Sequence, residues 1–383
     1  MTLFFRCSMI PLLLSLVVQA QAQTAPVIMP AAPELAAKSY ILVDFDSNVP
    51  IVEKLADERV EPASLTKIMT AYIVFDELRK GNLRLDDLVT VSAKAWRTGG
   101  SKTFIEVGKQ VRVEDLLRGM IVQSGNDATI ALAEHIAGTE EVFAAMMNQQ
   151  AKNLGMLNSH FKNSTGLPEP EHFTTARDLA TLARLMIRQF PEYYRWYAEK
   201  EFTFNGITQR NRNMLLWRDE SVDGMKTGHT ESAGYCLVAS AKREGMRLVS
   251  VILGAKSENG RAQETQSLIN FGFRFYETHK LYSANEALST ARIWKGAVEQ
   301  LPIGLQETLF VTIPRGQYPN LNASVQLLPT ITAPASMGQE MGTVQISLAG
   351  KLVAERPLIA LQDVEEGGLF SRLVDEVMLM IKQ

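Results

Sequence analysis

The sequence predicts a protein of the α+β class, in which an antiparallel sheet packed with helices is followed by a small all-β domain and an amphipathic helix. The apolar runs Tyr235 to Ala241 and Leu248 to Leu253 are separated by a Lys-Arg-Glu-Gly tetrapeptide, the pattern of a β-hairpin. Apolar residues at i, i+3, i+4 spacing occur before and after this hairpin, which indicates helices packed on a sheet. From about Tyr282 onward, short strand-like runs alternate with proline and glycine, which indicates a second, all-β domain.

The first residues have the pattern of an export signal. Arg6 precedes an apolar run from Ile10 to Val18 that is too short to span a bilayer comfortably, and Ala20-Gln21-Ala22 supplies the small residues of a cleavage site. The length of this run argues against a transmembrane anchor, and Cys7 has no apolar lipobox before it, which argues against a lipoprotein. We predict that residues 1–22 are a signal peptide and that the protein is exported from the cytoplasm.

The composition argues against several classes of function. A formal charge of −3 over 383 residues does not favour a nucleic-acid partner, since such proteins are usually basic. The five histidines are scattered without the spacing of a zinc site, and we expect neither a metal nor another cofactor. Beyond the signal peptide Cys236 is the only cysteine, so no internal disulfide is expected, and its apolar neighbours place it in a core.

Residues 23–281 are predicted to form the larger domain. After two strands around an Asp-Ser-Asn turn, a helix follows Ser64 and ends at Lys80-Gly81, where glycine suits the left-handed position beyond a helix. Lys226 is expected just before or at the start of a strand that pairs with the hairpin. The other helices are expected at residues 111–122, 128–137, 140–154, 174–189 and 257–279.

Residues 282–363 are predicted to form the all-β domain, and residues 364–383 a separate terminal helix. No motif in the all-β part carries chemistry. Gly367-Gly368 is a hinge before the helix, whose apolar residues form a wide stripe. Strands are expected at residues 309–313, 324–328, 343–348 and 352–354.

Ser64 and Lys67, at the head of the first long helix, are the first candidates for catalysis. Residues three apart lie on one face of a helix, so the hydroxyl and the amine are expected side by side. A serine is a weak nucleophile until a base takes its proton, and a desolvated lysine can be that base. A chain of this length contains about one Ser-x-x-Lys by chance, and the pair alone also fits an N-cap serine with a solvated lysine.

Two further motifs follow in order, Ser124-Gly125-Asn126 between two predicted helices and Lys226-Thr227-Gly228. Ser-x-x-Lys, Ser-x-Asn and Lys-Thr-Gly in this order are typical of penicillin-binding proteins and serine β-lactamases. The chain resembles the D-alanyl-D-alanine carboxypeptidases of the peptidase S11 family, which are low-molecular-mass penicillin-binding proteins. The resemblance extends over essentially the whole mature chain and includes residues 121–127, 174–179, 223–230, 311–316 and the terminal helix.

The resemblance implies the transpeptidase-like fold of penicillin-binding proteins and removal of the terminal D-Ala from peptidoglycan stem peptides. It implies that Ser64 forms an acyl-enzyme, with substrate or with β-lactam inhibitors, and that Lys67 accepts its proton. Ser124 would relay a proton towards the leaving D-Ala, and Asn126 would hold the substrate amide and the Lys67 ammonium. The implied substrate-binding residues are Lys226, Thr227 and Arg261 for the carboxylate, Gly228 for approach of the substrate backbone, and His229, whose N–H would join that of Ser64 in the oxyanion hole.

Three alternatives share part of this pattern. A β-lactamase needs a carboxylate that activates the second water, and Glu169 and Glu171 lie in a loop that could border the site. A D,D-endopeptidase would use every one of the same catalytic residues. A non-catalytic wall-binding scaffold would have no need of an activated serine.

The terminal helix is expected to be a membrane anchor. At about fifteen residues it is too short to cross a bilayer, so it would lie in the interface. Asp375 and Glu376 offset Arg372 and Lys382, so binding would depend on buried apolar area more than on anionic lipid. A core helix has the same pattern. We expect a peripheral protein on the periplasmic face of the inner membrane.

Overall fold

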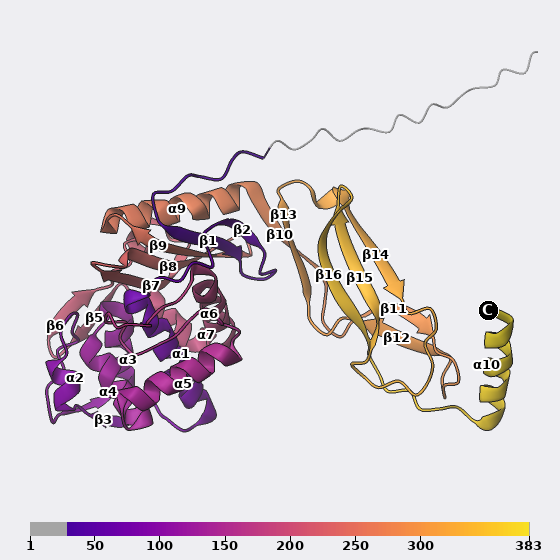
Figure 1. Cartoon of the computed structure of the whole chain (residues 1–383), viewed down its shortest axis with the longest axis horizontal. Coiled ribbons are helices and arrows are strands. Elements are labelled where there is room, and N and C mark those ends of the chain that lie inside the picture. The colour runs from indigo at the N-terminus through magenta and orange to yellow at the C-terminus, as the bar shows by residue number, and fades with distance from the viewer. Residues whose placement is uncertain (1–28, 383) are drawn as a thin grey trace, which may run out of the picture. The chain divides into compact units, whose positions relative to one another are not determined.

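A five-stranded antiparallel sheet is the framework of the first part of the chain in the computed structural model, which describes residues 29–382 (Figure 1). The predicted signal peptide lies outside the described residues. The strands are ordered β2-β1-β9-β8-β7, so the N-terminal pair lies beside the hairpin that the sequence predicts. Their bounds are Ser39–Asp44 (β1), Pro50–Lys54 (β2), Val222–Thr230 (β7), Gly234–Arg243 (β8) and Met246–Ala255 (β9).

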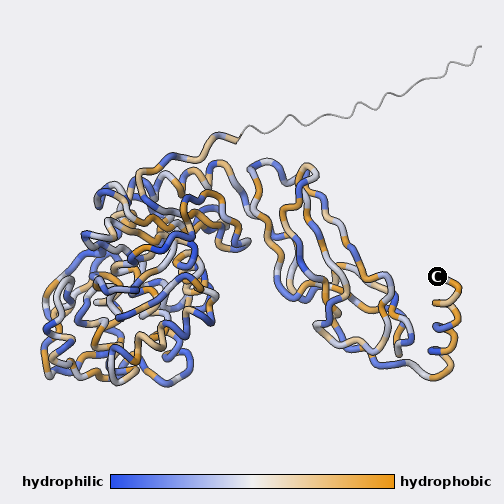
Figure 2. Tube along the Cα trace, viewed as in Figure 1, coloured by the Kyte–Doolittle hydropathy of each residue, from blue (hydrophilic) through white to orange (hydrophobic). Residues whose placement is uncertain are grey.

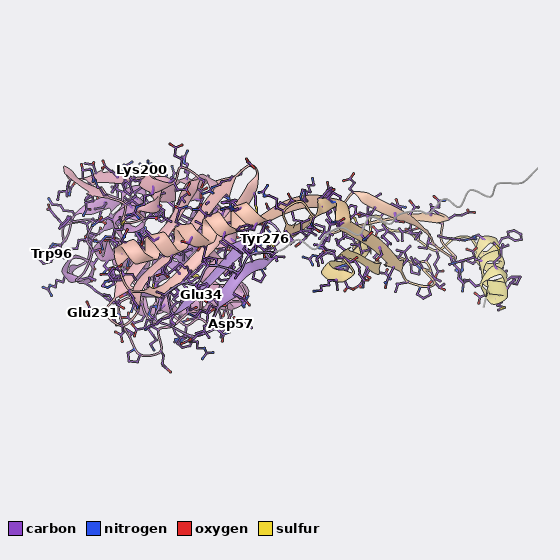
Figure 3. The ribbon with its side chains drawn as sticks, turned by 90° about the horizontal axis from the view of Figure 1, so that it is seen from above. Glu34, Asp57, Trp96, Lys200, Glu231 and Tyr276 are labelled. Atoms are coloured by element: carbon purple, nitrogen blue, oxygen red, sulfur yellow. The ribbon has the colours of Figure 1, made fainter. Side chains whose placement is uncertain are left out.

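Helices cover both faces of this sheet because successive strand residues point to opposite sides. On one face, Leu268 and Ile269 of α9 (Glu258–Phe275) pack against Leu248 of β9. Figure 3 shows α9 lying across the sheet, with Tyr276 directly beyond its last turn. The opposite face meets a larger core, where Val238 and Val251 join the buried side of the helical cluster. Cys236 is part of this core, as predicted.

The helix α1 (Thr66–Lys80) lies in the middle of that larger core. Ten consecutive residues of α1 are buried, from Thr66 to Phe75, so only its last turn meets solvent. It ends as predicted, because Gly81 adopts a left-handed conformation with φ 77°. The helices around it include α4 (Asn126–Ala137), α5 (Glu140–Asn153) and α6 (Ala176–Gln189).

Three expectations for this region are wrong in detail. The segment 111–122 is not one helix: it is β4 (Gln110–Arg112), α3 (Val113–Arg118) and a π turn, η2 (Gly119–Gln123). Lys226 lies inside β7 and not at its start. The long helix stops at Phe275, because the chain continues as a strand that pairs with a segment far away in the sequence.

Shorter elements complete the region. They are η1 (Ala63–Leu65), β3 (Leu88–Thr90), α2 (Ala93–Arg97), α7 (Pro191–Tyr194), η3 (Arg195–Ala198), β5 (Glu201–Phe204), β6 (Ile207–Arg210) and α8 (Leu215–Arg218).

The second region is all-β, as predicted. A two-stranded sheet pairs β10 (Tyr276–Tyr282) with β13 (Leu309–Pro314), and a five-stranded sheet has the order β11-β12-β16-β15-β14. Leu301, Val344 and Leu358 are in its core. Its remaining elements are β11 (Ala287–Arg292), β12 (Gln300–Gly304), η4 (Tyr318–Asn320), β14 (Leu321–Leu327), β15 (Glu340–Leu348) and β16 (Lys351–Ala360).

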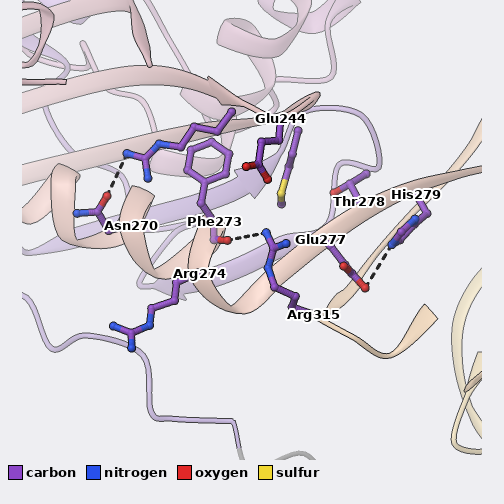
Figure 4. A pocket seen from close by; sticks show the side chains of 10 residues that line it. Glu244, Asn270, Phe273, Arg274, Glu277, Thr278, His279 and Arg315 are labelled. Atoms are coloured by element: carbon purple, nitrogen blue, oxygen red, sulfur yellow. Dashed lines mark hydrogen bonds and ion pairs between the residues drawn. The ribbon is translucent and has the colours of Figure 1, made fainter. Parts of the chain in front are cut away.

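A polar cavity of about 630 Å³ lies where α9 passes into β10 (Figure 4). Arg315 donates a hydrogen bond of 2.8 Å to the carbonyl of Phe273, and His279 lies 3.3 Å from the carboxylate of Glu277. Arg243, which also lines the cavity, is paired with the carboxylate of Asp219. None of the residues that line this cavity carries one of the predicted catalytic motifs.

The terminal helix α10 (Leu369–Lys382) has both hydrophobic and hydrophilic residues (Figure 2). Its acidic residues are engaged: Asp375 accepts a hydrogen bond of 2.6 Å from the backbone N–H of Lys295, and Glu376 forms an ion pair with the Lys295 side chain. Its apolar residues are exposed, with Phe370 83% and Ile381 80% accessible. Within residues 29–382, the helices are all too short or too polar to cross a membrane.

Candidate active site

Ser64 and Lys67 meet at the head of α1, as the spacing predicts. Ser64 lies in the 3₁₀ turn η1 and is half-buried, while Lys67 is in the first turn of α1 and only 1% exposed. The Lys67 Nζ atom is 3.1 Å from Ser64 Oγ. Ser64 lines a cavity while Lys67 is buried behind it, so the hydroxyl can be reached by a bound molecule and the amine is shielded from water.

Burial changes the protonation of Lys67. Its pKa is lowered from 10.5 to about 7, mainly by the loss of water on burial and then by the positive charge of Arg212, against the opposing charges of Glu140 and Asp127. Lys67 Nζ also donates a hydrogen bond of 2.6 Å to the carbonyl oxygen of Thr165. The amine is therefore held between the nucleophile and a fixed acceptor.

Ser124 and Asn126 are placed by an unusual turn. The π turn η2 ends at Ser124, which adopts a left-handed conformation with φ 67°. Its buried hydroxyl makes no hydrogen bond to any described residue, so it is free to bond a bound molecule. Asn126 begins α4 and does not lie in a link; its side-chain amide donates to the carbonyl of Gly99 at 2.8 Å and makes no hydrogen bond to Lys67.

The Lys-Thr-Gly motif lies on β7, the edge strand of the sheet. Lys226 is buried, and its pKa is well below its usual value because of burial and then the charge of Lys67. A side chain at Gly228 would come within 3.1 Å of Pro62 O and 3.2 Å of Ala63 Cβ, so the missing side chain there lets the strand approach the turn η1. His229 is exposed and stacks on Tyr235, with ring centroids 4.1 Å apart.

Arg261 reaches the same place from α9. Its guanidinium donates to the carbonyl of Gly228 at 3.3 Å and to Glu258 at 2.7 Å, and only 4% of the residue is exposed. Arg261 is therefore a buried residue and not a surface residue of the first turn of α9.

Arg212 is the main functional candidate that the sequence analysis missed. It is held between two buried asparagines: Asn211 donates to the carbonyl of Glu199, and Asn213 donates to the carbonyl of Gly224. The sequence Asn211-Arg212-Asn213 could have indicated it, because asparagine side chains often form hydrogen bonds with the nearby backbone and so hold the residue between them in place.

A cavity of about 170 Å³ brings most of these groups together. Two of its walls come from the turn η1 and the edge strand β7, so that the nucleophile faces an unpaired strand edge and a cluster of positive charge. It is lined by Ser64, Ser101, Ser124, Arg212, Thr227, Gly228, His229, Tyr235, Glu258 and Arg261.

Comparison with known proteins agrees with this arrangement. Residues 26–257 match the peptidase S11 family, described as D-alanyl-D-alanine carboxypeptidase, and residues 276–366 match the C-terminal domain of penicillin-binding protein 5. The chain is 48% identical to D-alanyl-D-alanine carboxypeptidase DacC of Escherichia coli, over 92% of this chain and 90% of that protein.

Two solved structures are also similar. Penicillin-binding protein 5 from Haemophilus influenzae superposes with a TM-score of 0.86 at 41% identity, over 88% of this chain and 100% of that one. Penicillin-binding protein D2 from Listeria monocytogenes, in its ampicillin-bound form, has a TM-score of 0.58 at 30% identity, over 62% of this chain and 98% of that one. The chain belongs to the peptidase S11 family of D-alanyl-D-alanine carboxypeptidases.

Proposed function

We propose that this protein removes the terminal D-Ala from peptidoglycan stem peptides through an acyl-enzyme on Ser64, and that β-lactams acylate the same hydroxyl. The observation that carries the proposal is the contact of 3.1 Å between Ser64 Oγ and the buried amine of Lys67. With a pKa of about 7, a large share of this amine is neutral at pH 7 and can accept a proton. An amine with the ordinary pKa would be neutral in about one molecule in 3,000 at that pH.

In the proposed reaction, Ser64 Oγ attacks the carbonyl carbon of the penultimate D-Ala while Lys67 takes the hydroxyl proton. The backbone N–H groups of Ser64 and His229 would stabilise the oxyanion. The carbon–nitrogen bond then breaks, and the free hydroxyl of Ser124 passes a proton to the departing D-Ala amine. Water attacks the ester, the same groups take its proton, and Ser64 is released. Asn126 would hold the substrate amide.

The terminal carboxylate of the substrate would bind among the cations at β7. Lys226 and Thr227 come from the strand, Arg261 from α9, and Arg212 from the loop before α8. Several positive charges converge on one small cavity, and a carboxylate offsets their mutual repulsion. The edge of β7 can pair with an extended peptide, which would align the scissile bond with Ser64.

Mass spectrometry tests the nucleophile. Wild-type protein incubated with penicillin should gain the mass of one penicillin on the peptide that contains Ser64, whereas Ser64→Ala should gain none. Ser101→Ala is the matched control, since Ser101 lines the same cavity and its backbone contact to Asn126 does not need the hydroxyl. An adduct on Ser64→Ala would contradict the assignment.

The substrate is tested by the release of D-Ala. A pentapeptide ending in D-Ala-D-Ala should lose one D-Ala, and a crosslinked muropeptide dimer should be cut more slowly. Faster cleavage of the dimer would favour the endopeptidase alternative. For the β-lactamase alternative, both carboxylates that the sequence offered, Glu169 and Glu171, are exposed in the structure.

We also propose that the mature protein is peripheral on the periplasmic face of the inner membrane and is anchored through α10. The support is that the acidic residues of α10 face Arg292 and Lys295, while its large apolar residues are exposed. The ion pairs neutralise Asp375 and Glu376, so they would not repel an anionic lipid surface. This arrangement differs from a loose hinge, because Gly367 N also donates to the carbonyl of Lys295.

Sedimentation with vesicles tests the anchor. The mature chain should sediment with inner-membrane vesicles even in high salt, because apolar burial is not screened. A chain ending at Glu366 should stay in solution and still release D-Ala. Exchange of Phe370, Leu373 and Ile381 for serine should have the same effect, whereas Arg372→Gln, on the same helix, should not. An unfolded or still membrane-bound truncated chain would mean that α10 is a core helix.

A further inference from the structure

We propose that His172 is a positioning residue for the acylation step, and that its imidazole fastens the loop 161–173 to the head of α1 so that the Thr165 carbonyl keeps Lys67 aimed at Ser64. The inference rests on the proposed role of Lys67 as the base. It concerns a histidine that belongs to none of the three catalytic motifs.

The hydrogen bonds of His172 define one tautomer. The ring is 4% exposed, and its Nδ1 atom accepts a hydrogen bond of 3.3 Å from the backbone N–H of Lys162. Nε2 therefore carries the proton and donates to Thr66 Oγ1 at 3.0 Å. Thr66 is the first residue of α1 and lies directly before Lys67. The imidazole thus joins the start of the loop to the start of the helix.

The remaining contacts show what this junction supports. Phe173 and His160 exchange two backbone hydrogen bonds of 2.8 and 3.0 Å, which close the base of the loop. Thr70 Oγ1 donates to the carbonyl of Ser164 at 2.7 Å, and Lys67 Nζ donates to the carbonyl of Thr165 at 2.6 Å. Two neighbouring carbonyls of the loop are therefore acceptors for side chains of α1.

The tip of the loop fits closely against the turn of the nucleophile. Asn163 Oδ1 accepts hydrogen bonds from the backbone N–H groups of Thr165 and Gly166, which folds the tip back on itself. A Cβ atom at Gly166 would lie 1.8 Å from the carbonyl oxygen of Ala63. Since the fit leaves no space there, a small displacement of the loop would move the Thr165 carbonyl away from Lys67.

The chemistry of an amine explains why this matters. A neutral lysine has one lone pair and two N–H groups, and it can act as a base only when the lone pair points at Ser64 Oγ. The fixed Thr165 carbonyl accepts one N–H and so restricts the rotation of the amine. The loop also covers Lys67 from water, which is the main cause of its lowered pKa. A loosened loop would lose both effects.

The neutral imidazole suits this role. Burial and then the charges of His160 and Lys67 lower the pKa of His172 to about 4. The ring is therefore neutral in the pH range around 7 in which Lys67 changes its charge, and it adds no positive charge beside Lys67.

Three variants test the proposal. His172→Leu removes the donor, His172→Gln keeps an amide donor that can reach Thr66, and Thr66→Val removes the acceptor at nearly constant volume. The rate of acylation by penicillin should fall about tenfold to a hundredfold in His172→Leu and Thr66→Val, the cost of misplacing a reacting group by about 1 Å. His172→Gln should stay within about threefold of wild type. The double variant Thr66→Val, His172→Leu should be no slower than the slower single variant.

The pH profile separates positioning from a loss of structure. The rate of acylation should fall on the acidic side of its pH profile as Lys67 gains a proton, and this acid limb should lie near pH 7 in wild type. It should move to higher pH in His172→Leu and Thr66→Val, because water would then reach Lys67 and raise its pKa. The other charged groups that act on Lys67 and on its neighbour Lys226 are Arg212, Arg261, Glu140 and Asp127, and they are unchanged. Partial unfolding would lower the number of active sites, which is given by the final amount of penicillin adduct, but it would leave the acid limb of the pH profile unchanged.

Each result decides the proposal. Equal losses in His172→Gln and His172→Leu would mean that the ring fills space, and an unmoved limb in Thr66→Val would overturn the proposal even if His172→Leu does not fold. If wild type acylates on Ser64 and all three variants match it, only the role of His172 fails. If wild type does not acylate on Ser64, the proposed function fails first.

Discussion

Replacing Lys67 with methionine should abolish acylation and stabilise the fold, and the gain in stability should depend on pH. The pKa of Lys67 is about 7 in the folded protein and 10.5 in an unfolded chain. Between these values the unfolded state binds the additional proton, so the free energy of unfolding of wild type rises with pH by about 1.4 kcal/mol per pH unit. The lowered pKa of the buried amine reduces the free energy of unfolding by about 4 kcal/mol at pH 7 and by about 1 kcal/mol at pH 9.5.

Methionine has a similar volume and no proton to lose. The difference in unfolding free energy between Lys67→Met and wild type should therefore shrink by about 3 kcal/mol from pH 7 to pH 9.5. The absolute gain at pH 7 should be smaller than about 4 kcal/mol, because methionine also loses the hydrogen bond to Thr165.

Urea unfolding followed by tryptophan fluorescence measures this difference. A Trp294→Phe background restricts the signal to the catalytic region, since Trp294 lies in the all-β region and the other three tryptophans precede residue 258. Ser64→Ala is the matched control: it is equally inactive but keeps Lys67, so its difference from wild type should be nearly constant with pH. A pH-independent difference for Lys67→Met would refute the lowered pKa of Lys67.

Three further predictions concern the same site. Lys67→Arg should form no penicillin adduct by mass spectrometry, because a guanidinium cannot be neutral at a workable pH; normal acylation would show that Lys67 is not the base. The penicilloyl-enzyme should persist much longer than the acyl-enzyme formed from a D-Ala-D-Ala peptide, since Glu169 and Glu171, the carboxylates that could activate the second water, are exposed; equal turnover of the two would support the β-lactamase alternative. Arg212→Gln should move the acid limb of acylation up by about half a pH unit, because the charge of Arg212 lowers the pKa of Lys67; an unmoved limb would mean that solvent screens this exposed arginine.

Local features of the chain were predictable where local physics decides them. The spacing of three between Ser64 and Lys67 brought the two side chains together, and Gly81 ended the helix because few other residues adopt its conformation freely. The hairpin was predictable because a short polar link joins two apolar runs. The family followed from the motifs and their order.

Other features depend on contacts between distant parts of the chain. The helix α9 stops at Phe275 because residues 276–282 pair with β13, and no local breaker marks that point. The π turn before Ser124 begins at Gly119, where the backbone packs closely against Thr103: a Cβ on Gly119 would lie 2.4 Å from the Thr103 side chain. Arg212 and the Thr165 carbonyl belong to the site only through tertiary placement, and a backbone carbonyl has no signature in a sequence.

If the proposed roles hold, the cluster of cations around Ser64 connects binding of the substrate to activation of the base Lys67. In the free protein, burial and the charge of Arg212 keep the pKa of Lys67 low, so a large share of the amine is neutral at pH 7. A substrate carboxylate among Arg212, Lys226 and Arg261 would offset that charge and raise the affinity of Lys67 for a proton, at the moment when Ser64 must lose one. The acid limb of kcat for a D-Ala-D-Ala peptide, which reports the complex, should therefore lie at higher pH than that of kcat/KM, which reports the free enzyme. Coinciding limbs would show that the carboxylate binds too far from Lys67 to act on it, and the cations would then serve recognition alone.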